Sequence, residues 1–226
     1  MCNLHSTQPQ RTPTLSSVEP LLAAEVPEHP ACTEALAFAQ SSLPESIFNH
    51  SFRVFLYARR TLLLPGPTTL TAPSTAPHVL FVACILHDIG TIDAHAADPE
   101  RFEVTGANMA ASLLKKHGVD EEAVREAWLA IAMHTSLHVA EGAGGLVTAL
   151  RLAVRADFGL YAGVGASALE EAESRLPRLG VEKELSDAVV KQAMAVPSKA
   201  PGGSWPRDLV RAQEAEPEWE GVNKAF

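Results

Sequence analysis

The stretch Val79-Leu80-Phe81-Val82-Ala83-Cys84-Ile85-Leu86-His87-Asp88-Ile89-Gly90-Thr91 joins an apolar run to a histidine–aspartate pair. Adjacent side chains diverge by about 100° on a helix, so His87 and Asp88 can both reach one ion only near a helix end. Gly90, directly after the pair, is typical of such an end. An imidazole nitrogen together with a carboxylate oxygen suits zinc, iron or manganese. A surface His-Asp dipeptide is the alternative, but a buried carboxylate requires a partner, which favours a metal.

The composition is that of an ordinary globular chain: 226 residues, of which 46% are hydrophobic and 20% charged. The net charge of −9 gives no electrostatic support for a nucleic-acid partner. No apolar run approaches the ~20 residues of a membrane helix, and residues 1–30 lack the apolar segment of a secretory signal. The cysteines, Cys2, Cys32 and Cys84, are odd in number and far apart, which argues against a disulfide scaffold. We therefore expect a cytoplasmic protein without a nucleic-acid or membrane partner.

Helical periodicity dominates the chain, and no stretch alternates convincingly as a strand. Ser42 followed by a first-turn proline, the capping residue Asp120 and the glycine Gly118 mark helix boundaries. We expect a short helix near residues 21–25 and a helical pattern from Thr33 onward. Further helices are expected over residues 43–61, 77–89, 102–117, 121–134, 146–160, 181–195 and 206–215. The fold class is therefore all-α, with an irregular N-terminal extension (1–30), a helical domain (31–197) and a C-terminal extension (198–226). The proline-rich loop 61–77 and the glycine-rich loop 137–145 are candidates to cover the mouth of a pocket.

Four side chains with metal-ligand chemistry lie on three of the expected helices. His87 and Asp88 end the apolar helix, His50 shares a face with apolar residues, and Asp157 interrupts a largely apolar helix. Taken singly, a core histidine or a capping aspartate would be the ordinary interpretation. Helical bundles, however, build metal sites from residues that project inward from facing helices. Each of the four residues is a weak signal alone, and we treat them as candidates for a metal site in the bundle.

The order of these residues resembles the HD superfamily of metal-dependent hydrolases, helical proteins with a histidine, a His-Asp pair and a distant aspartate. Four blocks are similar to the fungal cyanamide hydratase branch: Asn49-His50-Ser51-x-Arg53-Val54, Leu86-His87-Asp88-Ile89-Gly90-Thr91, Arg101-Phe102-Glu103-Val104-x-Gly106-Ala107 and Ala132-Met133-His134-Thr135-Ser136. The similarity runs from residue 33 to residue 197. It implies an HD-domain helical bundle with a buried metal site.

Carried over onto the matching positions, the resemblance implies the metal ligands His50, His87, Asp88 and Asp157. Zn²⁺ is the expected cofactor, with Fe²⁺ or Mn²⁺ as alternatives. Zinc lowers the pKa of a bound water to about 7, which suits the addition of water to a carbon–nitrogen triple bond. Cyanamide hydratases convert cyanamide to urea in this way. The catalytic residues are expected to be His134, which gives a proton to the substrate nitrogen, and Asp88.

Four other residues are expected to contact the substrate or to support the site: Thr91, Thr135, Arg53 and Glu103. Thr91 stands where phosphohydrolase members often carry a lysine, which favours a small neutral substrate over a phosphate. Arg53 could equally pair with a carboxylate and hold the site together, and Glu103 could orient a ligand histidine. For His134 the alternative is a helix C-terminal histidine that interacts with exposed carbonyl groups.

The leading prediction is a zinc-dependent hydratase acting on cyanamide or another small nitrile-like compound. Two alternatives remain open: an HD-type phosphohydrolase acting on a nucleotide or phosphomonoester, and a non-catalytic HD fold that binds a small molecule. The shared metal pattern and Arg53 fit the first, and the acidic composition permits the second. A homodimer is compatible with the apolar helices and occurs in the resembling family.

Overall fold

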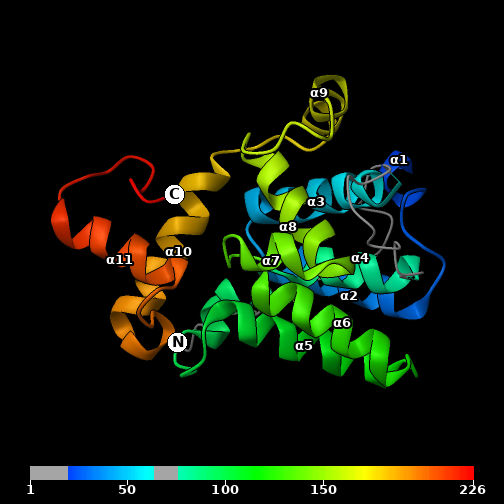
Figure 1. Ribbon diagram of the computed structural model, residues 1–226, viewed down its shortest axis with the longest axis horizontal. Helices are drawn as coiled ribbons and strands as arrows, with labels where there is room; N and C mark the ends of the chain where they lie inside the picture. Colours follow the sequence, from blue (N-terminus) through cyan, green and yellow to red (C-terminus); the bar gives the residue numbers. More distant parts are fainter. Residues whose placement is uncertain (1–19, 64–75) are drawn as a thin grey trace, which may run out of the picture.

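The computed structural model describes residues 20–63 and 76–226, and these residues form helices without a β-strand (Figure 1). The α-helices are α1 (Pro20–Ala23), α2 (Pro30–Ser42), α3 (Glu45–Leu63), α4 (Pro77–Leu86), α5 (Phe102–Lys116), α6 (Glu121–Met133), α7 (Val139–Ala143), α8 (Gly145–Asp157), α9 (Ala166–Arg175), α10 (Val181–Ala195) and α11 (Trp205–Ala215). Three short 3₁₀ helices are η2 (Ile89–Thr91), η3 (Asp93–His95) and η4 (Pro197–Lys199). The all-α prediction is confirmed.

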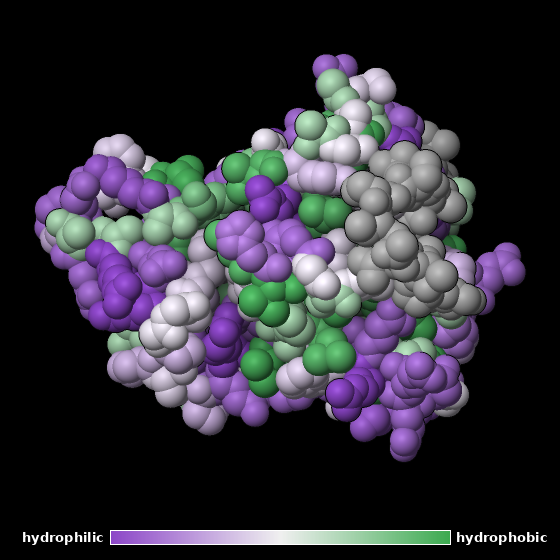
Figure 2. Space-filling view, in the orientation of Figure 1, coloured by the Kyte–Doolittle hydropathy of each residue, from purple (hydrophilic) through white to green (hydrophobic). Residues whose placement is uncertain are grey.

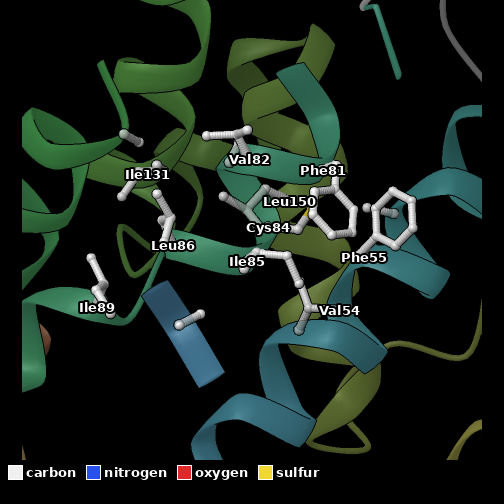
Figure 3. Close-up of a cluster of buried hydrophobic side chains, with 14 of the residues drawn as sticks. Val54, Phe55, Phe81, Val82, Cys84, Ile85, Leu86, Ile89, Ile131 and Leu150 are labelled. Atoms are coloured by element: carbon white, nitrogen blue, oxygen red, sulfur yellow. The ribbon is translucent and has the colours of Figure 1, made fainter. Parts of the chain in front are cut away.

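Helix α4 is the centre of the bundle. Its residues from Val79 to Leu86 are all buried, and it packs against α2, α3, α5, α6 and α8. A helix that is apolar on every side belongs inside a protein, because each face must be covered. Figure 3 shows its side chains between Phe55 of α3, Ile131 of α6 and Leu150 of α8. The run that opens the sequence analysis therefore organises the core and delivers the His-Asp pair at its end.

The chain leaves the α-helical conformation directly after His87. Asp88 has φ −102° and ψ 5°, and the next three residues form the tight turn η2. The α-helix thus ends at Leu86, three residues before the expected Ile89, because Asp88 has already left helical geometry. The change of backbone direction lets the adjacent side chains of His87 and Asp88 face the same point.

Two helices were not anticipated from the sequence, α7 and α9. In α9, Ala168 and Ala172 are the buried residues, and alanine gives little hydrophobic periodicity. Helix α7 has five residues and follows His138, whose φ is +65°. The other expected helices are present, including α10 with the expected bounds 181–195. Most of the expected loop 61–77 and of the N-terminal extension lies outside the described residues.

The C-terminal helices are attached to the His-Asp turn by polar contacts. Gln192 of α10 donates to the backbone carbonyl oxygens of Gly90 and Ile92 at 3.2 and 3.1 Å. Lys199 donates to the carbonyl oxygen of Glu100, just before α5. Helix α11 packs on α10. Residues beyond 197 are therefore held against the end of the bundle that carries the His-Asp pair.

None of the described helices combines the length and hydropathy that a membrane span requires.

Gly90 is required by a close backbone approach. A Cβ atom at this position would lie 2.1 Å from the carbonyl oxygen of Phe102, which cannot move without shifting α5. We expect Gly90→Ala to lower the free energy of unfolding by about 1–3 kcal/mol, as overpacking does. Chemical denaturation measures this change. Gly142→Ala is the control, because a Cβ there meets nothing within 4 Å and should be neutral or slightly stabilising. Equal stability of the two variants would contradict the packing argument.

Candidate metal centre

Side chains from the C-terminal ends of α4, α6 and α8 meet in one place. Helix α4 ends just before His87, α6 ends just before His134, and α8 ends at Asp157. Helix α3 contributes His50 and Arg53 from its side. Carbonyl groups at a helix C-terminus carry partial negative charge, so a point where three such ends meet favours a cation.

His50, His87 and Asp88 are buried and offer one ligand atom each to a single ion. The Nε2 atoms of the two histidines are 3.2 Å apart. The Oδ2 atom of Asp88 lies 3.1 Å from Nε2 of His87 and 3.5 Å from Nε2 of His50. Two ligand atoms about 2.0–2.1 Å from a tetrahedral zinc ion are about 3.3–3.4 Å apart. The three separations are therefore close to the edges of such a coordination site.

The other ring nitrogens of these histidines are already committed. Nδ1 of His87 lies 2.7 Å from the carbonyl oxygen of Cys84, and Nδ1 of His50 lies 2.7 Å from Oδ2 of Asp157. Carbonyl and carboxylate oxygens only accept, so each Nδ1 carries a proton. In neutral rings both Nε2 atoms are then bare acceptors. They lie beside Oδ2 of Asp88, which has no hydrogen-bond partner among the described residues. A cation satisfies all three atoms at once.

The charges of the buried groups fit this arrangement. Burial lowers the pKa of His50, which keeps the ring neutral. Burial also opposes a charge on His87, but the Asp88 carboxylate outweighs it and raises the pKa of His87. Burial alone would raise the pKa of Asp88, yet the neighbouring histidines hold it well below its usual range. Asp88 is thus a carboxylate, and Nε2 of His87 attracts either a proton or a metal ion.

Arg53 and Asp157 form a buried, two-pronged ion pair behind His50. Nε of Arg53 donates to Oδ1 of Asp157 at 2.7 Å, and Nη2 donates to Oδ2 at 2.8 Å. Nη1 of Arg53 donates to the carbonyl oxygen of Leu176 at 2.8 Å. Arg53 therefore fixes Asp157, which in turn orients the ring of His50. These contacts give Arg53 the structural role considered above, and the role of Asp157 as a fourth ligand stays a prediction.

His134 makes the contact of a helix C-terminal histidine, and its role as a proton donor stays a prediction. Its Nδ1 lies 2.6 Å from the carbonyl oxygen of Ile131, so it binds the last turn of α6. Its Nε2 points the other way and lies 3.5 Å from Oδ1 of Asp88. His87 contacts the last turn of α4 in the same manner. His134 thus approaches Oδ1 of Asp88, whereas His50 lies 3.5 Å from Oδ2.

The four residues expected to contact substrate differ in whether they line the cavity above the His-Asp pair. Thr135 lines the cavity above the His-Asp pair and donates to the buried carboxylate of Glu103 at 2.7 Å. Glu103 also accepts from Arg101, and its described partners include no histidine. The hydroxyl of Thr91 donates to the carbonyl oxygen of Asp88 at 2.7 Å. Thr91, Glu103 and Arg53 are not among the residues that line this cavity, so Thr135 is the one of the four that does, and its contact with substrate stays a prediction.

A cavity of about 640 Å³ opens above the three histidines and Asp88. Its mouth includes the exposed apolar side chains Leu137, Val139 and Leu160, so part of the glycine-rich loop 137–145 does border it. On the face drawn in Figure 2, hydrophobic and hydrophilic residues are mixed over α7 and α8. Cavities of this size and character bind small organic molecules.

Three aromatic residues of the cavity wall were missed in the sequence: Phe158, Trp205 and Phe226. Phe158 directly follows Asp157, and that adjacency was an available signal. Trp205 and Phe226 belong to the C-terminal extension, whose position over the site depends on the packing of α10 and α11. Sequence spacing carries no trace of that packing.

In a comparison with known families, the model of the HD domain matches residues 47–191. The matched segment contains His50, His87, Asp88, His134 and Asp157 and covers more than half of the chain. A search of curated proteins found no match.

Proposed function

Because this chain belongs to the HD-domain family, whose members are generally metal-dependent hydrolases, we propose that it is a zinc-dependent hydratase acting on cyanamide or a related nitrile. The observation that supports the metal is the meeting of two bare Nε2 atoms and an unpartnered carboxylate oxygen at separations of 3.1–3.5 Å. The proposed ligands are His50, His87 and Asp88. Asp157 is proposed to hold the ring of His50.

Zinc bound there would supply a Lewis acid and lower the pKa of a water molecule towards neutrality. The surrounding residues orient the ligand side chains and supply the negative charge. Asp157 and the carbonyl oxygen of Cys84 hold the two histidine rings with their Nε2 atoms inward. Asp88 keeps its negative charge, which suits a divalent cation.

Hydration of a nitrile forms a bond between the water oxygen and the nitrile carbon and breaks one π bond between carbon and nitrogen. The nitrogen then needs a proton. We propose that His134 delivers it from Nε2, while its Nδ1–H stays bound to the carbonyl oxygen of Ile131. The buried ring lies on the cavity wall beside Asp88, where it can take a proton from the attacking water and return it to the nitrogen.

The phosphohydrolase alternative is less well supported by the cavity. Three arginines line it, Arg101, Arg151 and Arg155. Each is paired with a carboxylate: Arg101 with Glu103, and the other two with Glu141. A phosphate would need cationic partners that are free to bind it. The position at which phosphohydrolase members often carry a lysine is Thr91 here, so this position supplies no cation for a phosphate either.

Production of urea from cyanamide by zinc-loaded protein tests the proposed reaction. A rate above that of buffer containing free zinc supports it. No hydration across cyanamide and a panel of nitriles, together with phosphate release from nucleotides, would replace it with the phosphohydrolase alternative.

We expect His134→Ala to keep its metal and to lose turnover by about 10²-fold or more, the usual scale for a missing acid–base group. The loss should remove one limb of the pH–rate profile. Metal content, melting temperature and turnover are measured on one sample. If the variant melts lower but turns over normally, His134 only caps α6 and is not the proton donor.

A further inference from the structure

Seven aromatic side chains at the metal centre and the cavity are joined by pairwise contacts into a closed circuit. In order of contact they are His50, Phe158, Phe226, Trp205, Phe102, His134 and His87. The centroid separations along this order are 4.7, 4.8, 5.7, 6.2, 5.7 and 4.9 Å, and the closing pair, His87 with His50, is 5.1 Å apart. All seven centroid separations lie within the range in which aromatic rings attract one another.

The circuit has two halves with different chemistry. The three histidines form one half, and His50 and His87 point their Nε2 atoms at the metal centre. The apolar rings form the other half, and Phe158, Trp205 and Phe226 line the cavity. These three side chains are only half-buried, whereas Phe102 behind them is buried. Part of the surface of these three aromatic side chains is therefore exposed to the cavity and is not covered by the rest of the protein.

The apolar half is held in place by specific contacts. Ser204 caps α11 by accepting from the backbone N–H of Arg207, which sets the position of Trp205. Asn223 donates to the carbonyl oxygen of Leu209 at 3.0 Å and accepts from the backbone N–H of Ala225 at 3.0 Å. The side chain of Asn223 thus ties Phe226 to α11. Trp205 and Phe226 lie beyond residue 191, where the HD-domain match ends.

The size of this space does not suit cyanamide alone. Cyanamide is little larger than a pair of water molecules, while the cavity measures about 640 Å³. A molecule that reaches from the metal centre to Trp205 and Phe226 must carry a body as well as a reacting group. That body would contact the aromatic side chains. The arginines that line the cavity are already paired with Glu103 and Glu141. Flat, uncharged, apolar groups are what such a surface binds.

We propose that Phe158, Trp205 and Phe226 form a substrate cup for an aromatic or similarly flat apolar body, attached to the group that reacts at the metal centre. This proposal rests on the proposed function: the preferred substrates are then aromatic nitriles, and cyanamide is a poor one. Trp205 and Phe226 select the substrate and are not catalytic residues.

Two metal-binding probes that differ in their body test the cup, namely benzohydroxamate and acetohydroxamate. Their dissociation constants are measured by calorimetry with the zinc-loaded full chain. We expect benzohydroxamate to bind at least about tenfold more tightly, as burial of a phenyl ring implies. Trp205→Leu and Phe226→Ala should weaken benzohydroxamate by at least about fivefold and leave acetohydroxamate within about twofold. Trp219→Ala is the matched control, because Trp219 lies in the same C-terminal segment but is exposed and does not line the cavity.

Equal affinities of the two probes for the wild type, or a preference that survives both substitutions, would overturn the cup. So would the absence of benzohydroxamate binding. Nitrile hydration is assayed separately on the same samples. If no nitrile is hydrated but the affinity ratio falls in the two variants, the proposed reaction fails and the cup stands. If nitriles are hydrated but the ratio of benzohydroxamate to acetohydroxamate affinity is the same in the wild type and the two variants, the cup fails and the reaction stands.

Discussion

His87→Ala will release the bound metal and reduce turnover by at least about 10³-fold, more than the loss of a proton donor alone. The substitution removes one of three ligand atoms, and it leaves Asp88 and His50 with an incomplete site. It also removes the partner of the buried carbonyl oxygen of Cys84. Elemental analysis of the desalted protein and a turnover assay measure the two effects.

His95→Ala is the control for this change. His95 is a histidine of the turn η3 that contacts Asp98 and takes no part in the metal centre. It should leave metal content and turnover unchanged. A His87→Ala variant that keeps full metal occupancy would show that the metal lies elsewhere.

Arg53→Met will lower the free energy of unfolding by about 3–5 kcal/mol, because it removes the two-pronged partner of a buried carboxylate and leaves it only the more distant guanidinium of Arg178, at 3.6 Å. Arg53 is fully buried, and both of its prongs bind Asp157. Burial raises the pKa of Asp157, but Arg53 and His50 together hold it below its usual range, so the carboxylate stays charged. Denaturant unfolding of metal-free protein measures the effect without a contribution from metal binding.

A double variant and a surface control make this prediction specific. Arg53→Met combined with Asp157→Asn removes the poorly compensated charge of Asp157 and should recover part of the loss. Arg60 lies on the same helix and pairs with Glu171, but both side chains are exposed. Arg60→Met should therefore cost less than about 1 kcal/mol. Similar losses for Arg53→Met and Arg60→Met would contradict the buried pair.

The fold and the ligand triad could be anticipated from the sequence because both depend on local patterns. The apolar run Val79–Leu86 predicts a buried helix, and the residues His87-Asp88 with Gly90 predict a metal-binding helix end. His50 and the pair then meet because α3 packs against α4. The all-α prediction is confirmed, and the structure brings His50, His87 and Asp88 into one buried cluster that could hold a metal ion; their roles as ligands stay predictions.

The surroundings of the triad could not be read from spacing. Arg53 lies three residues after His50, but nothing local shows that it would bind Asp157, which is 104 residues away. Thr91 lies next to the metal motif, yet its hydroxyl is used by the carbonyl oxygen of Asp88. The aromatic wall depends on Trp205 and Phe226, which are brought to the site by long-range packing.

An anomalous difference map at the zinc absorption edge, from crystals of the zinc-loaded chain, tests the central claim most directly. The account predicts one strong peak about 2.0–2.2 Å from Nε2 of His50, Nε2 of His87 and a carboxylate oxygen of Asp88. A peak at any other group of residues, with this cluster left without metal, would contradict it.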